Sequence, residues 1–67
     1  MTLQPYLVVY KNTYYTGIVW LSREPKVMKA GFTAVLVNVA VATQFEVLLD
    51  RRRGNWIPVD EFKPRLI

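Results

Sequence analysis

The sequence predicts an all-β fold: a small five-stranded barrel or a strongly bent antiparallel sheet, with room for one short helical turn near residues 24–30. Residues 32–43 (FTAVLVNVAVAT) carry valine at positions 35, 37, 39 and 41, and this period of two is typical of a strand. Short β-rich segments stand on both sides of this run, separated by turn-forming residues. The 67 residues suffice for a single domain, 1–67.

A β-hairpin is predicted at the start of the chain. Residues 6–11 (YLVVYK) and 14–21 (YYTGIVWL) are rich in β-branched and aromatic side chains, and Asn12 with Thr13 permits a turn between them. Gly17 indicates a β-bulge or a close approach of another segment. Residues 22–31 lack alternation, so we expect a connection there with at most one helical turn.

Two further strands are expected after the valine-rich one. Residues 45–50 alternate, with Phe45, Val47 and Leu49 on one face. Residues 51–55 (RRRGN) favour a turn, after which residues 56–59 (WIPV) resume an extended pattern. Because Pro58 has no N–H to donate, this last strand is expected at a sheet edge or where a barrel closes.

A long helix over about residues 26–53 is the alternative interpretation of this region. Apolar residues occur there at helical spacing, at Val27, Ala30, Ala34, Val37, Val41, Phe45 and Leu48. Against a helix, six of the eleven residues from 33 to 43 are β-branched, and such a helix would be apolar around its whole circumference. We therefore favour strands.

The order of the predicted strands is similar to that of the small barrels of the SH3-like class, which includes Sm-like modules. The resemblance is carried by the runs VLVNVAV and FEVLLD and by the ending WIPVDEF. In many such barrels an aromatic residue, a proline and a following acidic and aromatic pair close the sheet in this way. The resemblance implies a closed five-stranded barrel.

Self-association is expected because the valine-rich strand is apolar on both faces, and a chain of 67 residues is too short to cover both. The chain has no cysteine and no histidine, so disulfides and the usual zinc sites cannot add stability. The predicted interface between copies consists of Phe32, Ala34, Leu36, Asn38 and Ala40. Asn38 is expected to pair with its symmetry mate and set the register. The alternative cover is residues 22–31 of the same chain, which reach only part of this face.

The sequence contains few residues that could act in catalysis. The chain has five carboxylates, of which only Asp60 and Glu61 are adjacent, and neighbours in a strand point to opposite faces. It has no glycine-rich phosphate loop, nucleophile elbow or metal-ligand spacing. We therefore expect a protein that is not an enzyme and that uses no cofactor and no metal.

Nucleic acid is a candidate partner, because the formal charge is +4, guanidinium groups pair with phosphates, and aromatic rings stack on bases. The predicted contact residues are Arg51, Arg52, Arg53, Tyr14, Tyr15 and Trp56, with Tyr10 as a further stacking candidate. The alternative is that the arginines form a solvated turn and that the tyrosines pack in the core.

We therefore expect a small, basic, non-catalytic β-barrel module that self-associates and binds a macromolecular partner, with nucleic acid as one candidate. The alternative is a protein-interaction factor, such as a small regulatory or inhibitory protein of phage or plasmid type, that docks on a larger protein through an apolar and aromatic surface. The lack of cysteine and of a signal-peptide pattern favours the cytoplasm. A membrane helix over residues 30–49 is disfavoured, because Asn38, Gln44 and Glu46 would lie in hydrocarbon.

Overall fold

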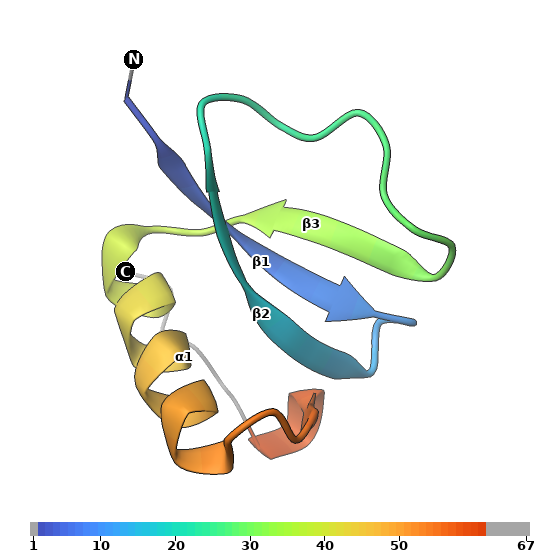
Figure 1. The fold of residues 1–67 in the computed structure, drawn as a ribbon, viewed down its shortest axis with the longest axis vertical. Coiled ribbons are helices and arrows are strands. Elements are labelled where there is room, and N and C mark those ends of the chain that lie inside the picture. Colours follow the sequence, from blue (N-terminus) through green and yellow to red (C-terminus); the bar gives the residue numbers. More distant parts are fainter. Residues whose placement is uncertain (1, 62–67) are drawn as a thin grey trace.

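The computed structural model describes residues 2–61. The described residues form an antiparallel sheet of four strands, and Figure 1 shows a helix beside this sheet. In chain order the elements are β1 (Gln4–Tyr10), β2 (Tyr14–Leu21), β3 (Phe32–Leu36), α1 (Val39–Arg52), β4 (Ile57–Pro58) and the short 3-10 helix η1 (Val59–Glu61). The strand order across the sheet is β3-β1-β2-β4, so that β1 and β2 are central and β3 and β4 are the edges.

The predicted hairpin is confirmed. Strands β1 and β2 pair antiparallel, and the turn between them places Lys11 and Asn12 at positive φ, 50° and 56°. The pairing slips between Val8 and Val9, which leaves Thr16 without an opposite residue. This β-bulge lies beside Gly17, as the sequence indicated, and a Cβ atom at Gly17 would meet nothing within 4 Å.

The predictions of a strand over residues 32–43 and of another over 45–50 are corrected by the structure. β3 ends at Leu36, and α1 occupies the region that follows. The Asn38 side chain accepts a hydrogen bond from the Val41 N–H at 2.8 Å, which caps the helix and ends the extended chain. Strand alternation would place Phe45 and Val47 on one face, yet Phe45 is 0% exposed and Val47 is 50% exposed.

The helical alternative describes the second half of this region correctly. Val41 and Phe45 are buried and Leu48 is half-buried, and all three pack in the core, which is the helical spacing that the sequence contains. The same alternative is wrong for residues 26–37, because residues 22–31 form an irregular connection and β3 follows them. No helical turn forms near residues 24–30 in this connection.

The sheet is not a closed barrel, so the barrel implied by the SH3-like resemblance is corrected. β4 has only two residues, pairs with β2 alone and contains Pro58, which agrees with the predicted edge position. Within residues 2–61 four strands form, because the residues 45–50 expected to supply another strand belong to α1. A sheet of this size with β3 and β4 apart cannot close.

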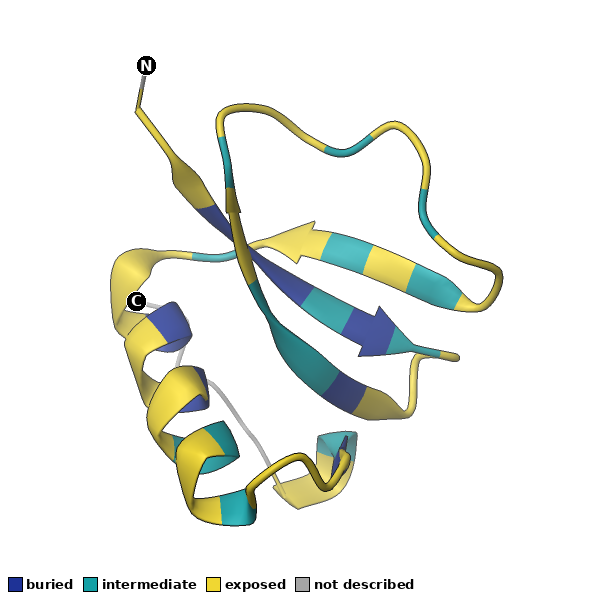
Figure 2. Cartoon of the chain, viewed as in Figure 1, coloured by how far each residue is buried: buried dark blue, intermediate teal, exposed yellow. Residues whose placement is uncertain are grey.

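The core lies between α1 and one face of the sheet. Strand alternation turns Leu7, Val9 and Tyr15 toward the helix, where they meet Val41, Phe45 and Ile57. Figure 2 shows the buried side of α1 facing the sheet and its exposed side facing away. Among residues 2–61, no helix has both the length and the apolar character that a membrane span requires.

Candidate functional site

The sheet face opposite α1, here called the far face, has no helix over it in the described part of the chain. Strand alternation and the pairing registers assign its residues. They are Tyr6, Val8 and Tyr10 of β1, Tyr14, Gly17, Val19 and Leu21 of β2, Phe32, Ala34 and Leu36 of β3, and Pro58 of β4. None of these residues carries a charge, which sets this face apart from the rest of a basic protein.

Four aromatic rings meet at one end of the far face and form what we call the aromatic cluster: Tyr10, Tyr14, Phe32 and Trp56. The Tyr10 ring centroid lies 4.8 Å from that of Phe32 and 4.7 Å from that of Trp56. The Tyr14 and Trp56 centroids are 5.8 Å apart. Trp56 is 49% exposed and Tyr14 is 39% exposed, so part of the aromatic surface is open to a ligand.

Several elements hold the aromatic cluster together. The tight hairpin turn sets Tyr10 opposite Tyr14, and the pairing of β1 with β3 sets Tyr10 opposite Phe32. Gly31, at φ +85°, lies so close to Tyr10 that a Cβ atom there would come within 3.0 Å of the ring, which requires glycine at this position. The Lys11 N–H donates to the Gly31 carbonyl at 2.6 Å and fastens the two strand ends.

A cation lies against the aromatic cluster. The Lys11 ammonium lies 5.2 Å from the Tyr10 ring centroid, within the range of a cation–π contact. In the sequence, Lys29 precedes Phe32 by three positions and Arg53 precedes Trp56 by three. The contact of Lys11 with Tyr10 therefore combines aromatic surface with positive charge.

The structure brings together some of the predicted nucleic-acid residues and separates others. Tyr14 and Trp56 meet in the aromatic cluster. Tyr15 faces the other way, with its ring centroid 5.0 Å from that of Phe45, and burial raises its pKa above the usual value. The prediction of Tyr15 as an exposed contact residue is therefore wrong.

The arginine triplet does not form a hairpin turn. Arg51 and Arg52 lie in the last turn of α1, where positive charge is favourable to the helix dipole. Arg52 is paired with Glu61 of η1. Arg53 ends the helix in the left-handed region at φ 49°, with its N–H donating to the Leu49 carbonyl. Arg51 and Arg53 are exposed and carry no ion pair among the described residues.

The residues predicted as an interface between copies divide into two groups. Phe32, Ala34 and Leu36 share the far face of β3, and Leu36 is 55% exposed. Asn38 caps α1 and Ala40 lies exposed in its first turn, so their predicted placement on a strand is wrong. The Asn38 side-chain oxygen accepts a hydrogen bond from the Val41 N–H as the cap of α1. Asn38 therefore does not set the register between paired strands, contrary to the prediction.

Sequence reasoning did not connect Phe32 and Lys11 to the aromatic site. Lys11 could have been included, because a turn immediately after Tyr10 places it at the same end of the hairpin. No local feature of the sequence could have placed Phe32 in the aromatic site. Phe32 reaches Tyr10 through the pairing of β1 with β3, and the two residues are over twenty positions apart in the chain.

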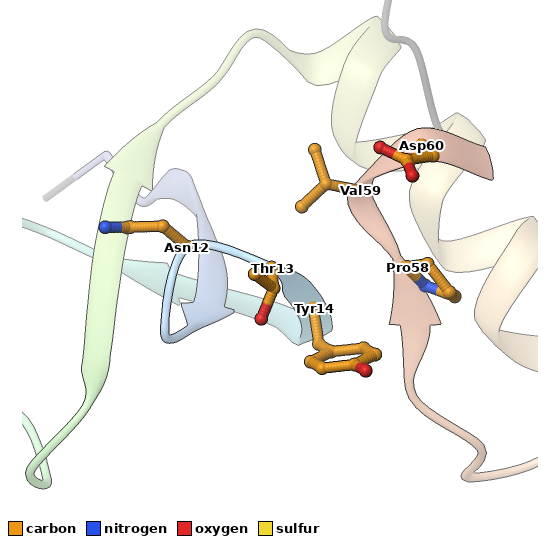
Figure 3. Close-up of a pocket in the computed structure, with 6 residues that line it drawn as sticks. All are labelled: Asn12, Thr13, Tyr14, Pro58, Val59 and Asp60. Carbon is orange, nitrogen blue, oxygen red and sulfur yellow. The ribbon is translucent and has the colours of Figure 1, made fainter.

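A shallow pocket of about 330 Å³ adjoins the aromatic cluster where the hairpin turn meets β4 and η1. Its lining is shown in Figure 3 and consists of Asn12, Thr13, Tyr14, Pro58, Val59 and Asp60. The Val59 N–H donates to the Thr13 carbonyl at 2.9 Å and holds the two sides of the pocket together. Asp60 is the only carboxylate in this lining, and the Tyr14 phenol is the other group there that can ionise.

Within residues 2–61, no three acidic, histidine or cysteine side chains gather as they would to hold a metal ion. Comparison with known proteins adds no relative: neither a protein family, nor a curated protein, nor a solved structure matches the chain. The aromatic cluster with the adjoining Lys11 ammonium is therefore the feature from which a function can be argued.

Proposed function

We propose that this protein is a non-catalytic binding module that takes up single-stranded nucleic acid on the aromatic cluster. The observation that carries the proposal is the group of four contacting rings, of which Trp56 is 49% and Tyr14 is 39% exposed, with the Lys11 ammonium over the Tyr10 ring. Every nucleobase has a π-face, so such a surface binds unpaired bases with little sequence preference.

The charge of the chain fits this ligand. The net charge of +4 favours an anionic partner, Lys11 follows Tyr10 directly, and Lys29 and Arg53 are three positions before Phe32 and Trp56 in the chain. Their cationic groups would contact phosphates while the rings receive bases. Arg52 contributes less, because Glu61 already neutralises it. Nucleic-acid contact therefore centres on the cluster and its rim and not on the arginine triplet as a unit.

The two tryptophans provide a matched test. Trp56 belongs to the aromatic cluster, whereas Trp20 is 39% exposed and donates from its indole N–H to Glu46 of α1. We expect Trp56→Ala to weaken binding of fluorescently labelled oligo(dT) and oligo(U) about tenfold, the effect of losing one stacked base at ~1–3 kcal/mol. Trp20→Ala should leave the affinity unchanged in the same fluorescence-anisotropy titration.

Salt dependence provides the second arm of the experiment. Lys11→Ala should reduce the slope of log affinity against log salt concentration by about 1, which is the loss of one phosphate contact. Arg52→Ala should change the slope less. No binding of either oligonucleotide at low salt, or equal losses in Trp20→Ala and Trp56→Ala, would refute the proposal.

A protein-interaction factor remains the second candidate, favoured by the absence of charge on the far face and by the exposure of Leu36. Such a module would dock on an apolar surface of a larger protein, and its binding would respond little to salt. Leu36→Glu would abolish this binding and Arg51→Ala would not. The cytoplasm remains the proposed compartment for either function, on the lack of cysteine.

A further inference from the structure

We propose that two copies of this chain pair through the outer edge of β3, so that their sheets join into one continuous sheet. This goes beyond the nucleic-acid proposal and does not depend on it. β3 is at one end of the strand order, and within residues 2–61 no strand pairs with its outer side. Figure 1 shows β3 beside β1 at this edge, with the connection from residue 22 to 31 entering at its Phe32 end.

The hydrogen bonds to β1 determine which backbone groups of β3 point outward. The Lys11 N–H donates to the Gly31 carbonyl and the Val37 N–H donates to the Pro5 carbonyl. In an antiparallel pair, residues that face the neighbour alternate with residues that face away. Thr33 and Val35 therefore face β1, and Ala34 and Leu36 direct their N–H and C=O groups to the open side.

Phe32 selects the register of the proposed pair. Its N–H also points outward, but it already donates to the Lys29 carbonyl at 3.0 Å. In an antiparallel pair of β3 strands centred on Ala34, the Leu36 carbonyl of each copy would lie opposite the Phe32 N–H of the other copy. That N–H is already used within its own chain. A pair centred on Val35 instead joins Ala34 of each copy to Leu36 of the other, and all the outward donors and acceptors of these two residues are used.

The side chains of β3 suit this arrangement. The strand FTAVL has no charge, no proline and no bulge, so it lacks the devices that protect edge strands from pairing. Val35 is 50% exposed and would lie directly against its symmetry mate. On the far face, the small Ala34 would lie opposite Leu36, which is 55% exposed.

The pairing would enlarge the proposed binding surface. Two strands related by a two-fold axis at Val35 turn their far faces to the same side of the joined sheet. Because the strands run in opposite directions, the two aromatic clusters would lie at opposite ends of this surface. A dimer would then present two clusters to one nucleic-acid strand, although the pairing itself needs no nucleic acid.

Two equally exposed valines allow a controlled test. Val35 and Val47 are both 50% exposed, but Val47 lies on the outer side of α1. In sedimentation equilibrium without nucleic acid, the wild type and Val47→Lys should reach twice the monomer mass of 7.8 kDa as concentration rises. Val35→Lys should weaken the dimer at least about tenfold, since like charges would meet across the axis. Far-ultraviolet circular dichroism checks that each variant is folded.

Amide hydrogen exchange by NMR tests the edge itself. In the monomer the N–H groups of Thr33 and Val35 should exchange slowly and those of Ala34 and Leu36 quickly. In the dimer the last two should become protected, and Val35→Lys should restore their fast exchange. The proposal is overturned if the wild type stays at the monomer mass at every concentration. It is also overturned if a dimer forms in which the Ala34 and Leu36 amides still exchange quickly.

Discussion

Neighbouring tyrosines of the same strand have different environments in this protein. Tyr14 is 39% exposed in the aromatic cluster, whereas Tyr15 is 8% exposed against Phe45. The only difference between them is the face of β2 to which each points, because successive side chains alternate. A residue type in a strand therefore indicates a function only after its face is known.

Burial of Tyr15 predicts a pH dependence of stability. Desolvation raises its pKa in the folded state, because the charged phenolate is disfavoured there. The stability that the neutral Tyr15 side chain contributes is fully present below the pKa of about 10 that tyrosine has in the unfolded chain. It is lost as the pH rises through the higher pKa of Tyr15 in the folded state. We expect the free energy of unfolding to fall less steeply above about pH 10 in Tyr15→Phe than in the wild type.

Spectroscopic titration checks the cause of this effect. Ultraviolet absorbance should show a tyrosine component that ionises above the ordinary tyrosine pKa of about 10, because burial raises the pKa of Tyr15. This late component should be absent from Tyr15→Phe. Identical titration curves for the two proteins would contradict the assignment.

The helix α1 forms from residues with strand preferences. Val39, Val41, Thr43 and Val47 are β-branched, yet all lie within α1. Intrinsic preferences differ by less than about 1 kcal/mol per residue, whereas burying a large apolar side chain such as Phe45 contributes about 1.5–3 kcal/mol. Packing of Val41, Ala42 and Phe45 against the sheet therefore outweighs the local preference.

Two substitutions of Asn38, the N-cap residue of α1, should have different effects on stability. Asn38→Ala removes the acceptor of the Val41 N–H and should lower the free energy of unfolding by about 1 kcal/mol. Asn38→Asp keeps an acceptor and adds a negative charge at the helix start, so it should be neutral or stabilising. Urea denaturation measures both variants. Equal stability of Asn38→Ala and the wild type would show that the cap is dispensable.

At the scale of the whole molecule, α1 covers one face of the sheet, and within residues 2–61 no helix covers the other face. The connection of residues 22–31 and the short β4 complete the described fold. This asymmetry leaves the far face as the surface on which we propose that a partner binds. It also predicts that α1 depends on the sheet, since its buried residues Val41 and Phe45 pack against Leu7, Val9 and Tyr15.

An isolated peptide tests this dependence. A helix of 14 residues is near the limit below which isolated helices are marginal in water, at about 12–15 residues. We expect a peptide of residues 38–54 to show little helix by far-ultraviolet circular dichroism, while the full chain shows the helix of α1. A strongly helical peptide would mean that local sequence, and not packing, specifies α1.

The parts of the fold that could be predicted are those set by neighbouring residues. The hairpin follows from two β-rich segments and the turn-forming residues between them, and the edge position of β4 follows from Pro58. Tyr14 and Trp56 were both predicted as contact residues for nucleic acid, and their rings lie 5.8 Å apart, a proximity that depends on β2 pairing with β4. The position of Arg52 beside Glu61 and the burial of Tyr15 had no local signal.

By itself, the sequence determined the hairpin, the basic charge, the edge strand and the lack of histidine and cysteine, because each depends on residue identity or on contacts a few positions apart. Only the tertiary structure decided that the valine-rich run divides at Asn38 into a strand and a helix, and that Phe32 joins Tyr10 and Trp56. The physical reason is that valines at every second position are locally compatible with both a strand and a helix. The choice depends on which side chains can be buried against strands distant in the chain.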